Sequence, residues 1–397
     1  MEDFKFLKDE LNLLRERSLL RTLSCVESAQ GPVMTVDGRE LVVFCSNNYL
    51  NLAEDSEIAQ AVIETVKQRG YGAGASRLIS GTTGLHLKAE EKLAGMFGKE
   101  AALLLPSGWA ANEAVIRTIP QKGDIVLLDK LDHASIIDAA RACEAQFRTF
   151  RRDRLDKLER FLQDGSFAHK FIVSESIFSM DGERADLKRL VALKEKYGAV
   201  LIIDEAHAFG CLGEKGAGLA EELGVLDGVD IIVATMSKAV GATGGVVAGK
   251  KVVIDYLVNK ARAFIYTTAP PPANCAAILK AIEIIQTQRQ RREKLRENAV
   301  YIKRRLQQAS VNTGCSNSHI IPVIIGGEAD TLRIAGKLKE RGFYVSAIRP
   351  PTVPAGTSRL RISLQSRHSQ EQLDGLCDAI ISLVQAQGDF RGSFCRG

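Results

Sequence analysis

Two stretches of sequence decide the fold: AVLIIDEAHAFG (199–210) and DIIVATMSKAVGATGG (230–245). Each contains a short continuous apolar run that gives way to charged and hydroxyl side chains. Such a run is typical of a strand buried on both faces of a parallel sheet. In doubly wound sheets, ligands bind beyond the carboxyl ends of the strands. The two stretches therefore predict an α/β fold that carries Asp204, His207 and Lys238 along one sheet edge.

The same pattern continues on both sides of these stretches. Apolar runs alternate with amphipathic stretches such as 187–197, which predicts strands alternating with helices. The predicted strands are 101–105, 124–128, 171–174, 199–203, 231–234 and 244–249. Reactive or small residues follow three more of them, namely Gly108 and Trp109, His133, and Ser179. A lysine, an acid, two histidines and several hydroxyl groups are thus expected to converge.

The flanking regions predict a second domain and an N-terminal appendage. Leucines at helical spacing predict a helix over 5–23, and the chain after Pro270–Pro272 predicts a long helix over 273–306. The basic face of that long helix favours a solvated surface over an anion site. The order strand, helix, strand, strand, helix after Gly314 predicts a small α+β domain. The predicted division is 1–46 for the N-terminal helix and connecting segment, 47–285 for the large domain, 286–386 for the small domain and 387–397 for a disordered tail.

Composition limits the class of function. The chain has 397 residues, of which 45% are hydrophobic and 25% charged, as in ordinary globular proteins. A net charge of +5 is small for a nucleic-acid binder of this length. The mixed-charge start and the absence of a long apolar run predict neither an export signal nor a membrane span. The eight cysteines form no CxxC pair and are expected as reduced thiols. The prediction is a cytoplasmic enzyme with no metal site, nucleic-acid partner or membrane partner.

A nucleotide-hydrolysing helicase is one alternative, because Asp204–His207 reads DEAH. Gly244–Lys250 even approaches a phosphate-binding loop. The next residue is Lys251, however, where such a loop needs Ser or Thr to hold Mg²⁺. The loop also follows the DEAH segment, whereas nucleotide-binding folds place it first. These two departures disfavour the helicase interpretation.

An acid at one strand end and a lysine at the next suit pyridoxal phosphate. The lysine amine can join the cofactor aldehyde as a Schiff base, and burial with nearby positive charge lowers its pKa. The acid can keep the pyridine nitrogen protonated. Small residues at a helix start can hold the phosphate. A solvated surface lysine is the alternative for Lys238, but it fits poorly with Thr235 and Ser237 at the end of an apolar strand.

The sequence resembles the α-oxoamine synthases, pyridoxal-phosphate enzymes of the aspartate-aminotransferase fold (fold type I), over about residues 5–385. The motifs that carry the resemblance are SNNYLNL (46–52), YGAGASRLISGTTGLHLKAEEKLA (71–94), LDHAS (131–135), ESIFSMDG (175–182), DEAHAFG (204–210), TMSKAVGATGG (235–245) and IRPPTVPAGTSRLRISL (348–364). The resemblance implies a mostly parallel central sheet with a smaller C-terminal α+β domain. It also implies pyridoxal 5′-phosphate as the cofactor.

The resemblance assigns roles residue by residue. It implies Lys238, Asp204 and His133 as catalytic: Lys238 as the Schiff-base lysine, Asp204 on the pyridine nitrogen, and His133 stacked on the ring. A backbone-satisfied histidine at a helix start is the alternative for His133. The other implied cofactor-binding residues are Gly108, Trp109, Ser179, His207, Thr235 and Thr268, with Thr268 reaching across from a second subunit. The implied substrate-binding residues are Arg21, Asn47, His133, Thr352 and Arg361, with Arg361 on the amino-acid carboxylate.

The segment 348–364 most resembles the members that join L-alanine to a pimeloyl thioester with loss of CO₂. The implied partners are therefore L-alanine, a pimeloyl thioester of coenzyme A or of acyl carrier protein, and a second copy of the chain. A sister activity, glycine plus acetyl-CoA giving 2-amino-3-oxobutyrate, is the nearest rival. A catalytically silent partner or regulator is a rival of another class. Trp109 and Asn51 depart from the family pattern, and Asn51 is expected to keep a left-handed turn.

Overall fold

The computed structural model describes residues 4–386, so the predicted disordered tail over 387–397 lies outside the described residues. The chain clusters into two compact units. The large unit comprises Leu50–Ser179 and Arg184–Arg292, and the small unit comprises, within the described residues, 4–49, Met180–Glu183 and 293–386. The predicted domain boundaries at 46 and 285 stay a prediction.

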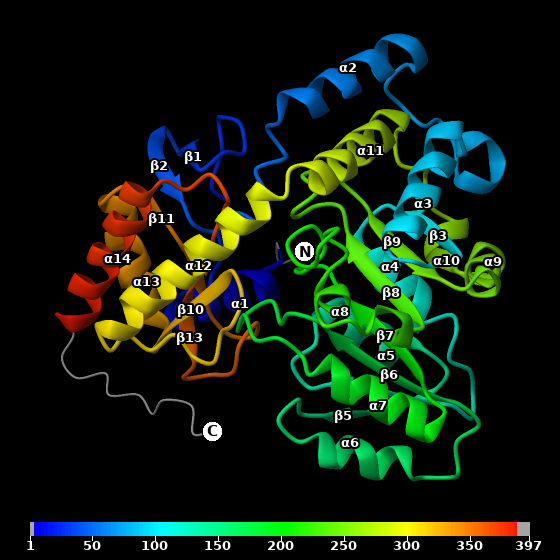
Figure 1. The fold of residues 1–397 in the computed structure, drawn as a ribbon. Coiled ribbons are helices and arrows are strands. Elements are labelled where there is room, and N and C mark those ends of the chain that lie inside the picture. The colour runs from blue at the N-terminus through cyan, green and yellow to red at the C-terminus, as the bar shows by residue number, and fades with distance from the viewer. Residues whose placement is uncertain (1–3, 387–397) are drawn as a thin grey trace. The chain divides into compact units, whose positions relative to one another are not determined.

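The large unit is built on a seven-stranded sheet (Figure 1). Its strands are β3 (Ala101–Leu105), β4 (Ile125–Asp129), β5 (Gln146–Phe150), β6 (Lys170–Glu175), β7 (Val200–Asp204), β8 (Ile231–Thr235) and β9 (Gly245–Gly249). They lie in the order β3-β9-β8-β7-β6-β4-β5. The pairs from β8 to β5 are parallel, and β9 is antiparallel to both of its neighbours. The carboxyl ends of β4, β6, β7 and β8 therefore share one edge of the sheet.

Six predicted strands agree with the structure to within one residue at each end, and β3 agrees exactly. Their side chains are almost all buried, which is why they read as continuous apolar runs. The edge strand β5 was not predicted. Its sequence QFRTF buries only Phe150, so it shows no continuous apolar run.

Helices flank the sheet of the large unit (Figure 1). They are α2 (Ser56–Arg69), α3 (Gly84–Met96), α4 (Gly108–Ile116), α5 (Ala134–Ala142), α6 (Leu155–Leu162), α7 (Leu187–Tyr197), α8 (Leu219–Glu222), α9 (Lys251–Lys260), α10 (Arg262–Ile265) and α11 (Pro272–Thr287), with short turns at Arg77–Gly81 and Leu226–Gly228. Helix α7 matches its prediction exactly.

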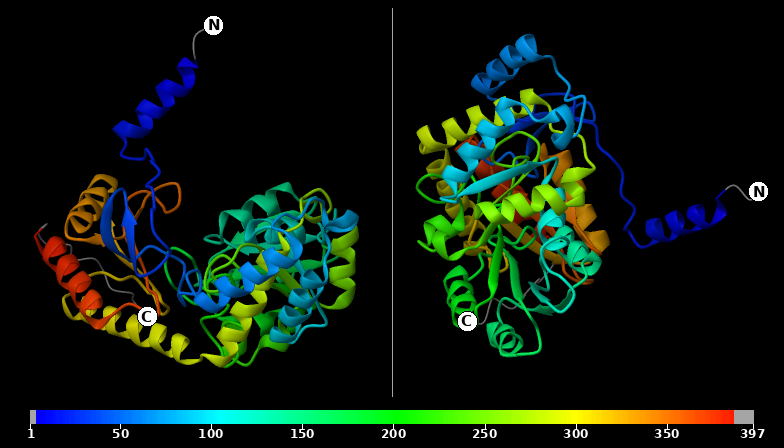
Figure 2. Two further views of the ribbon diagram at one scale, coloured as in Figure 1. Left: turned by 90° about the horizontal axis from the view of Figure 1, so that it is seen from above. Right: turned by 90° about the vertical axis from the view of Figure 1, so that its right-hand side faces the viewer.

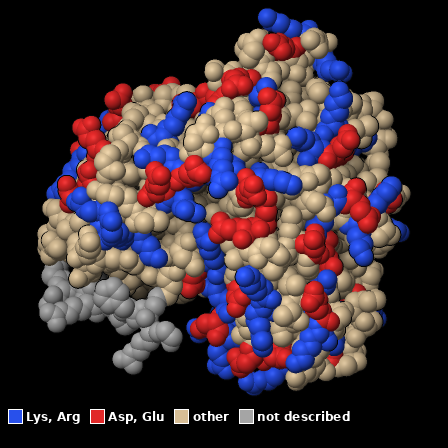
Figure 3. Space-filling view, viewed as in Figure 1, with Lys and Arg blue, Asp and Glu red and all other residues tan. Residues whose placement is uncertain are grey.

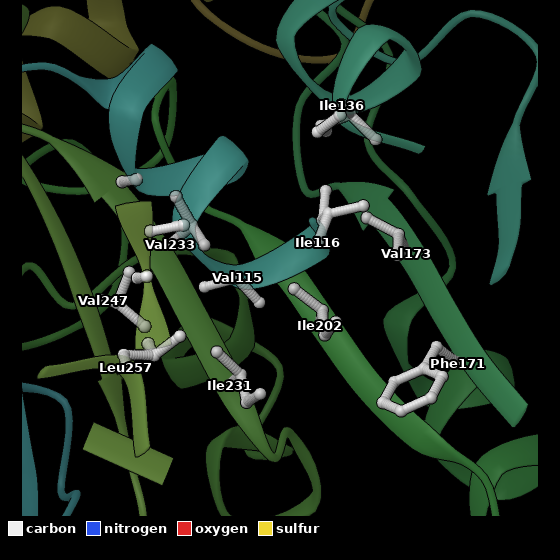
Figure 4. Close-up of a cluster of buried hydrophobic side chains, with 14 of the residues drawn as sticks. Val115, Ile116, Ile136, Phe171, Val173, Ile202, Ile231, Val233, Val247 and Leu257 are labelled. Atoms are coloured by element: carbon white, nitrogen blue, oxygen red, sulfur yellow. The ribbon is translucent and has the colours of Figure 1, made fainter. Parts of the chain in front are cut away.

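Helix α4 packs on the sheet through a cluster of buried aliphatic side chains (Figure 4). Val115 and Ile116 of α4 are fully buried in this cluster. Ile202, Val233 and Val173 come to it from β7, β8 and β6. Burying each such side chain stabilises the fold by about 1.5–3 kcal/mol. The packing fixes the start of α4 beside the carboxyl ends of the strands.

The small unit contains two three-stranded sheets. One has the order β1-β2-β11 and the other β10-β13-β12. The strands are β1 (Val33–Val36), β2 (Arg39–Val43), β10 (Ile320–Gly326), β11 (Phe343–Tyr344), β12 (Ser346–Ile348) and β13 (Ser358–Ser363), and the helices are α1 (Lys5–Glu16), α12 (Gln290–Gln308), α13 (Glu328–Glu340) and α14 (Gln370–Gln385). The second strand predicted after Gly314, over 344–348, is divided between β11 and β12, which belong to different sheets.

Two predicted helices differ from the structure. The N-terminal helix α1 ends at Glu16 rather than Leu23, because Ser18 adopts a left-handed conformation with φ 56°. None of its residues is buried. Figure 2 draws this helix in blue at the N-terminus. The predicted long helix 273–306 is two helices, α11 and α12, since Gln288 has non-helical dihedrals. The break separates the apolar, largely buried α11 from the polar α12.

The prediction that this basic face is solvated is wrong at two positions in the first turn of α12, which still belongs to the large unit. Arg291 donates to the Asp55 carboxylate over 2.6 Å, and its side chain is largely buried. Arg292 is buried and donates to the carbonyl oxygens of Ile285 and Glu214. Both arginines therefore hold chain segments together.

Other sequence-based expectations have mixed outcomes. Asn51 has φ 56°, which confirms its left-handed turn.

Cys211, Cys275 and Cys377 are buried free thiols, but Cys315 is disulfide-bonded, contrary to the expectation of reduced thiols throughout. Among the helices of residues 4–386, none has the length and apolar character that crossing a membrane requires. On the face that Figure 3 shows, basic and acidic side chains are interspersed.

Candidate active site

The carboxyl ends of β7 and β8 bring the predicted lysine and acid into one cluster. Asp204 is the last residue of β7, and Lys238 lies in the loop that follows β8. Lys238 Nζ lies 2.8 Å from Nε2 of His207, which follows β7. Asp204 and His207 are buried, with exposed fractions of 6% and 4%. A half-buried primary amine is thus held against a buried imidazole.

The Asp204 carboxylate is fixed by two hydrogen bonds. Its Oδ1 accepts from the backbone N–H of Ala206 over 2.8 Å, and its Oδ2 accepts from Asn112 Nδ2 over 2.8 Å. A carboxylate offers about four lone-pair sites, so each oxygen can accept a further donor. The carboxylate is therefore oriented and still able to bind a protonated ring nitrogen.

His133 caps the start of α5 and lies edge-on to Trp109. The His133 ring centroid is 6.1 Å from that of Trp109, with the ring planes at 78°. Its Nδ1 accepts from the backbone N–H of Ser135 and lies 2.8 Å from Ser135 Oγ. Burial and, to a smaller extent, the charge of Lys238 lower the pKa of His133, although Asp204 opposes this. The lowered pKa favours a neutral imidazole at neutral pH.

The N-terminus of α4 forms a cradle with the end of β8. A Cβ atom built on Gly108, the first residue of α4, would lie 3.1 Å from Thr235 Cβ. A Cβ on Gly245 would overlap the carbonyl oxygen of Ser107. The backbone at Gly245 therefore comes this close only because glycine occupies that position, and a side chain at Gly108 would crowd Thr235. Unpaired N–H groups at a helix start, next to the Thr235 hydroxyl, suit a phosphate group.

Buried carboxyl groups underlie the cluster. Glu175 ends β6, and its carboxyl accepts from the backbone N–H groups of His133 and Ser179. Burial, reinforced by the nearby Asp204, raises the pKa of Glu175 to about 8, although Lys238 opposes the shift. Burial likewise raises the pKa of Asp132, whose Oδ1 accepts from the backbone N–H of Glu175. These carboxyls tie the loops after β4 and β6 together.

The small unit holds the four other residues predicted to bind substrate. Arg361 on β13 is buried, and its Nη1 donates to Ser363 Oγ over 2.7 Å and to Asn47 Oδ1 over 3.3 Å. Thr352 and Arg21 are exposed, and Arg21 makes only a long contact of 3.5 Å with the carbonyl oxygen of Pro350. The structure brings Arg361 and Asn47 together, whereas Arg21 and Thr352 are held loosely.

Several predicted residues of the large unit do come together, and three further ones were missed. The cluster contains Lys238, His207, Asp204, His133, Trp109, Ser179, Gly108 and Thr235. Thr268 instead forms an isolated antiparallel bridge with Ser76. The missed residues are Asn112, Ser135 and Glu175. Asn112 could have been found as the one amide in an otherwise small and apolar stretch of α4, and Glu175 as an acid at a strand end.

Comparisons with known proteins agree with this site. Residues 39–380 match the family Aminotransferase class I and II. The 8-amino-7-oxononanoate synthase of Geotalea daltonii is 42% identical over 384 residues, which cover 96% of this chain and 98% of that protein. Its namesake from Chromobacterium violaceum is 43% identical over 375 residues, which cover 94% of this chain and 97% of that protein. The chain therefore belongs to the aminotransferase class I and II family.

Solved structures confirm the predicted fold. The serine palmitoyltransferase of Sphingomonas wittichii has a TM-score of 0.91 at 30% identity and covers 97% of this chain and 98% of that chain. The 8-amino-7-oxononanoate synthase of Francisella tularensis has a TM-score of 0.77 at 28% identity, with 87% of this chain and 98% of that chain covered. The predicted pyridoxal-phosphate fold type I, with its mostly parallel sheet and smaller C-terminal domain, is confirmed.

Proposed function

We propose that this protein condenses L-alanine with a pimeloyl thioester, releasing CO₂ and the carrier thiol and forming 8-amino-7-oxononanoate for biotin biosynthesis. The protein is an acyltransferase that uses pyridoxal 5′-phosphate. The observation that carries the proposal is the Lys238–His207–Asp204 cluster, in a chain whose relatives at 42–43% identity share one name.

The residues of the large unit fit pyridoxal phosphate. The oriented Asp204 carboxylate would accept from the ring nitrogen, and His207, whose Nε2 lies 2.8 Å from Lys238 Nζ, would contact the ring's 3-oxygen together with Ser179. Gly108, Trp109 and Thr235 would hold the phosphate end and the ring. When bound, the cofactor supplies an aldehyde that joins amines and a ring that withdraws electrons from the amino acid's α-carbon.

The chain's own residues supply proton transfer and orientation. Lys238 Nζ would act as the base that removes the α-proton from L-alanine. His133 would help to hold the ring and would donate a proton to the substrate. Arg361 would bind the alanine carboxylate as a two-pronged donor, with Asn47 holding the guanidinium. Arg21 and Thr352 would contact the acyl substrate.

The rival activity uses glycine, which lacks one methyl group of alanine, and an acetyl group in place of the pimeloyl chain. A pocket can use a single methyl for only about 1–3 kcal/mol, or 10–200-fold. A pimeloyl chain has several methylenes to bury and a terminal carboxyl to satisfy, so the acyl side should discriminate more strongly. The high TM-score to serine palmitoyltransferase does not favour a serine substrate, since that similarity reports the fold.

One assay tests the proposal. Purified holoenzyme is given alanine, glycine or serine with pimeloyl-CoA, pimeloyl-acyl carrier protein, acetyl-CoA or palmitoyl-CoA, and products are identified by mass. We expect alanine with a pimeloyl thioester to give the highest kcat/KM. Faster turnover of glycine with acetyl-CoA would overturn the assignment and leave the cofactor chemistry standing. Absence of turnover with every pair would favour a silent partner.

We also propose a homodimer with shared sites. Tyr71, Ile79 and Tyr266 are 71%, 81% and 72% exposed, and they lie on the two segments that the Ser76–Thr268 bridge joins. Large exposed apolar side chains of this kind mark association surfaces. Thr268 would then serve the cofactor phosphate of the neighbouring subunit. The cytoplasm is the proposed location, because six of the seven described cysteines are free thiols and Cys315 alone among them is disulfide-bonded.

A mixed dimer tests the shared site. One chain carries Lys238→Ala and the other Thr268→Ala, and the mixed species is purified with two different tags. If the two subunits share their sites, one site of the mixed dimer carries both changes and the other carries neither. The active site should then bind the cofactor with the affinity of the unchanged enzyme, at about half its activity. An active site with the weakened affinity of the Thr268→Ala homodimer would contradict sharing.

A further inference from the structure

Asn112 and Ser135 connect two residues of the site that belong to different strand ends. Asn112 lies on α4 and Ser135 on α5, and both are buried, with exposed fractions of 3% and 1%. Asn112 Nδ2 lies 2.8 Å from Asp204 Oδ2 and 3.0 Å from Ser135 Oγ, which lies 2.8 Å from His133 Nδ1. We propose that Asn112, acting through Ser135, is a positioning residue that fixes the neutral tautomer of His133 with its proton on Nε2.

Asp204 determines which groups donate and which accept along this chain of hydrogen bonds. An ionised carboxylate can only accept, so the amide group that faces Asp204 has to be the NH₂ of Asn112. A flipped amide would set an oxygen against the carboxylate, with no proton between them. The Nδ2 group has two protons, and the two contacts use one each. Asn112 Oδ1, which has no hydrogen-bond partner, plays no part in the connection.

The direction then passes through Ser135 to His133. Ser135 Oγ accepts from Asn112, so its single proton is left to donate, and His133 Nδ1 is the acceptor within reach. The backbone N–H of Ser135 donates to the same Nδ1 over 3.2 Å. Two donors aimed at Nδ1 require that this nitrogen carry no proton. The proton of a neutral ring is then on Nε2.

The charges around His133 agree with a neutral ring. Burial, the largest cause, lowers the pKa of His133, and the Lys238 charge adds to this while Asp204 opposes it. Glu175, which accepts from the His133 backbone N–H, has a raised pKa. A neutral Glu175 carboxyl does not favour a positive charge on the His133 ring. His133 would therefore present Nε2–H as a proton donor at neutral pH, and Asn112 would hold Asp204 by the same amide group. The inference rests on the proposed function, in which His133 donates a proton.

Nitrogen NMR reads the tautomer directly. Cofactor-loaded protein is prepared with ¹⁵N-labelled histidine, and His133 is assigned by the signals that vanish in His133→Asn. In the unchanged protein we expect Nδ1 to give the signal of an unprotonated ring nitrogen and Nε2 that of an N–H. Ser135→Ala should raise the proportion of the Nδ1–H tautomer about fivefold, as expected for losing one neutral hydrogen bond. Ser135→Thr keeps the hydroxyl and should restore the original signals.

Asn112→Leu separates the proposal from a purely structural role. It should raise the Nδ1–H tautomer as Ser135→Ala does, and it should also shift the pH at which the cofactor absorbance changes, because Asp204 loses a donor. Ser135→Ala should leave that absorbance titration unchanged. Ser174→Ala is the matched control, since Ser174 is 2% exposed and its hydroxyl donates only to the Glu175 carbonyl oxygen.

Two results would overturn the inference. One is an unchanged tautomer in both Ser135→Ala and Asn112→Leu, and the other is an equal change in Ser174→Ala. Neither result depends on turnover. Failure to convert alanine and a pimeloyl thioester would instead contradict the proposed function, so the two failures are distinguishable.

Discussion

The two units of this protein hold their proposed functional residues in different ways. In the large unit, Asp204 is buried, Lys238 is half-buried and His133 is exposed, and contacts of 2.8–3.2 Å hold all three side chains. In the small unit, only Arg361 and Asn47 touch each other, over 3.3 Å, and Arg21 and Thr352 are exposed. The difference suggests that cofactor chemistry depends on a rigid constellation, whereas substrate choice depends on side chains that a bound substrate can order.

The largest effect should come from Lys238→Ala. The chain would lose its nucleophile and its proton-transfer group, each of which typically contributes 10²–10⁴-fold, so kcat should fall by at least about 1,000-fold. The measurement is a steady-state assay with alanine and a pimeloyl thioester, and Lys250→Ala on the surface serves as the control. A fall in kcat of less than tenfold would show that Lys238 is not essential for catalysis and that the large unit does not hold the catalytic residues.

Asp204→Asn should have the next largest effect. The amide lacks the negative charge that keeps the ring nitrogen protonated, so kcat should fall by roughly 100–1,000-fold while the melting temperature changes little. Asp230→Asn is the control, because Asp230 accepts from the Leu201 backbone N–H at the opposite end of β7. Near-normal turnover of Asp204→Asn would show that this carboxylate is structural.

Arg361→Lys examines the small unit. A lysine cannot form the two-pronged bond to a carboxylate, so KM for alanine should rise about 10–100-fold with a smaller change in kcat. Arg359→Lys is a close control, since Arg359 lies on the same strand, is equally buried and forms an ion pair with Asp181. If kcat fell and KM stayed constant, Arg361 would belong with the catalytic constellation, and the two units would not differ as described.

The smallest effect concerns the pH dependence of stability at Glu175. The folded-state pKa of Glu175, about 8, exceeds its ordinary value of 4.5, so the folded state binds the proton more tightly. Raising the pH from 5 to 8 therefore ionises Glu175 in the unfolded chain first and lowers the free energy of unfolding. Glu175→Gln removes this loss, so the variant should gain at least about 1 kcal/mol relative to the original between pH 5 and pH 8.

Chemical denaturation of the cofactor-loaded protein at both pH values measures this gain. Glu113→Gln, on the exposed side of α4, is the control. A constant difference in unfolding free energy between Glu175→Gln and the original would show that Glu175 is ionised throughout the range.

Most of the large sheet could be predicted because strands that are buried on both faces consist of continuous apolar residues. Strands such as β8 and β4 are buried at every position, and a continuous apolar run has few other meanings. Strand β5 was missed because an edge strand buries few side chains. The break between α11 and α12 was missed because Gln288, which ends α11 with non-helical dihedrals, is not marked by a nearby glycine or proline in the sequence.

The candidate site was predictable where chemistry and strand ends coincide. Asp204, His207 and Lys238 follow apolar runs directly, so topology alone brings them to one edge. Asn112 and Ser135 were not predicted, because their meeting depends on how α4 and α5 pack. The predicted roles of Thr268 at the phosphate and Thr352 at the substrate depend on the family resemblance alone. Nothing in the sequence around either residue indicates such a role.

Reductive trapping of the cofactor tests the central claim most directly. The purified protein should be yellow, and borohydride should fix the cofactor covalently to the chain. After digestion, mass spectrometry should find the modification on Lys238, within TMSKAVGATGG (235–245). A modification on another lysine, or a protein that binds no pyridoxal phosphate, would contradict the account.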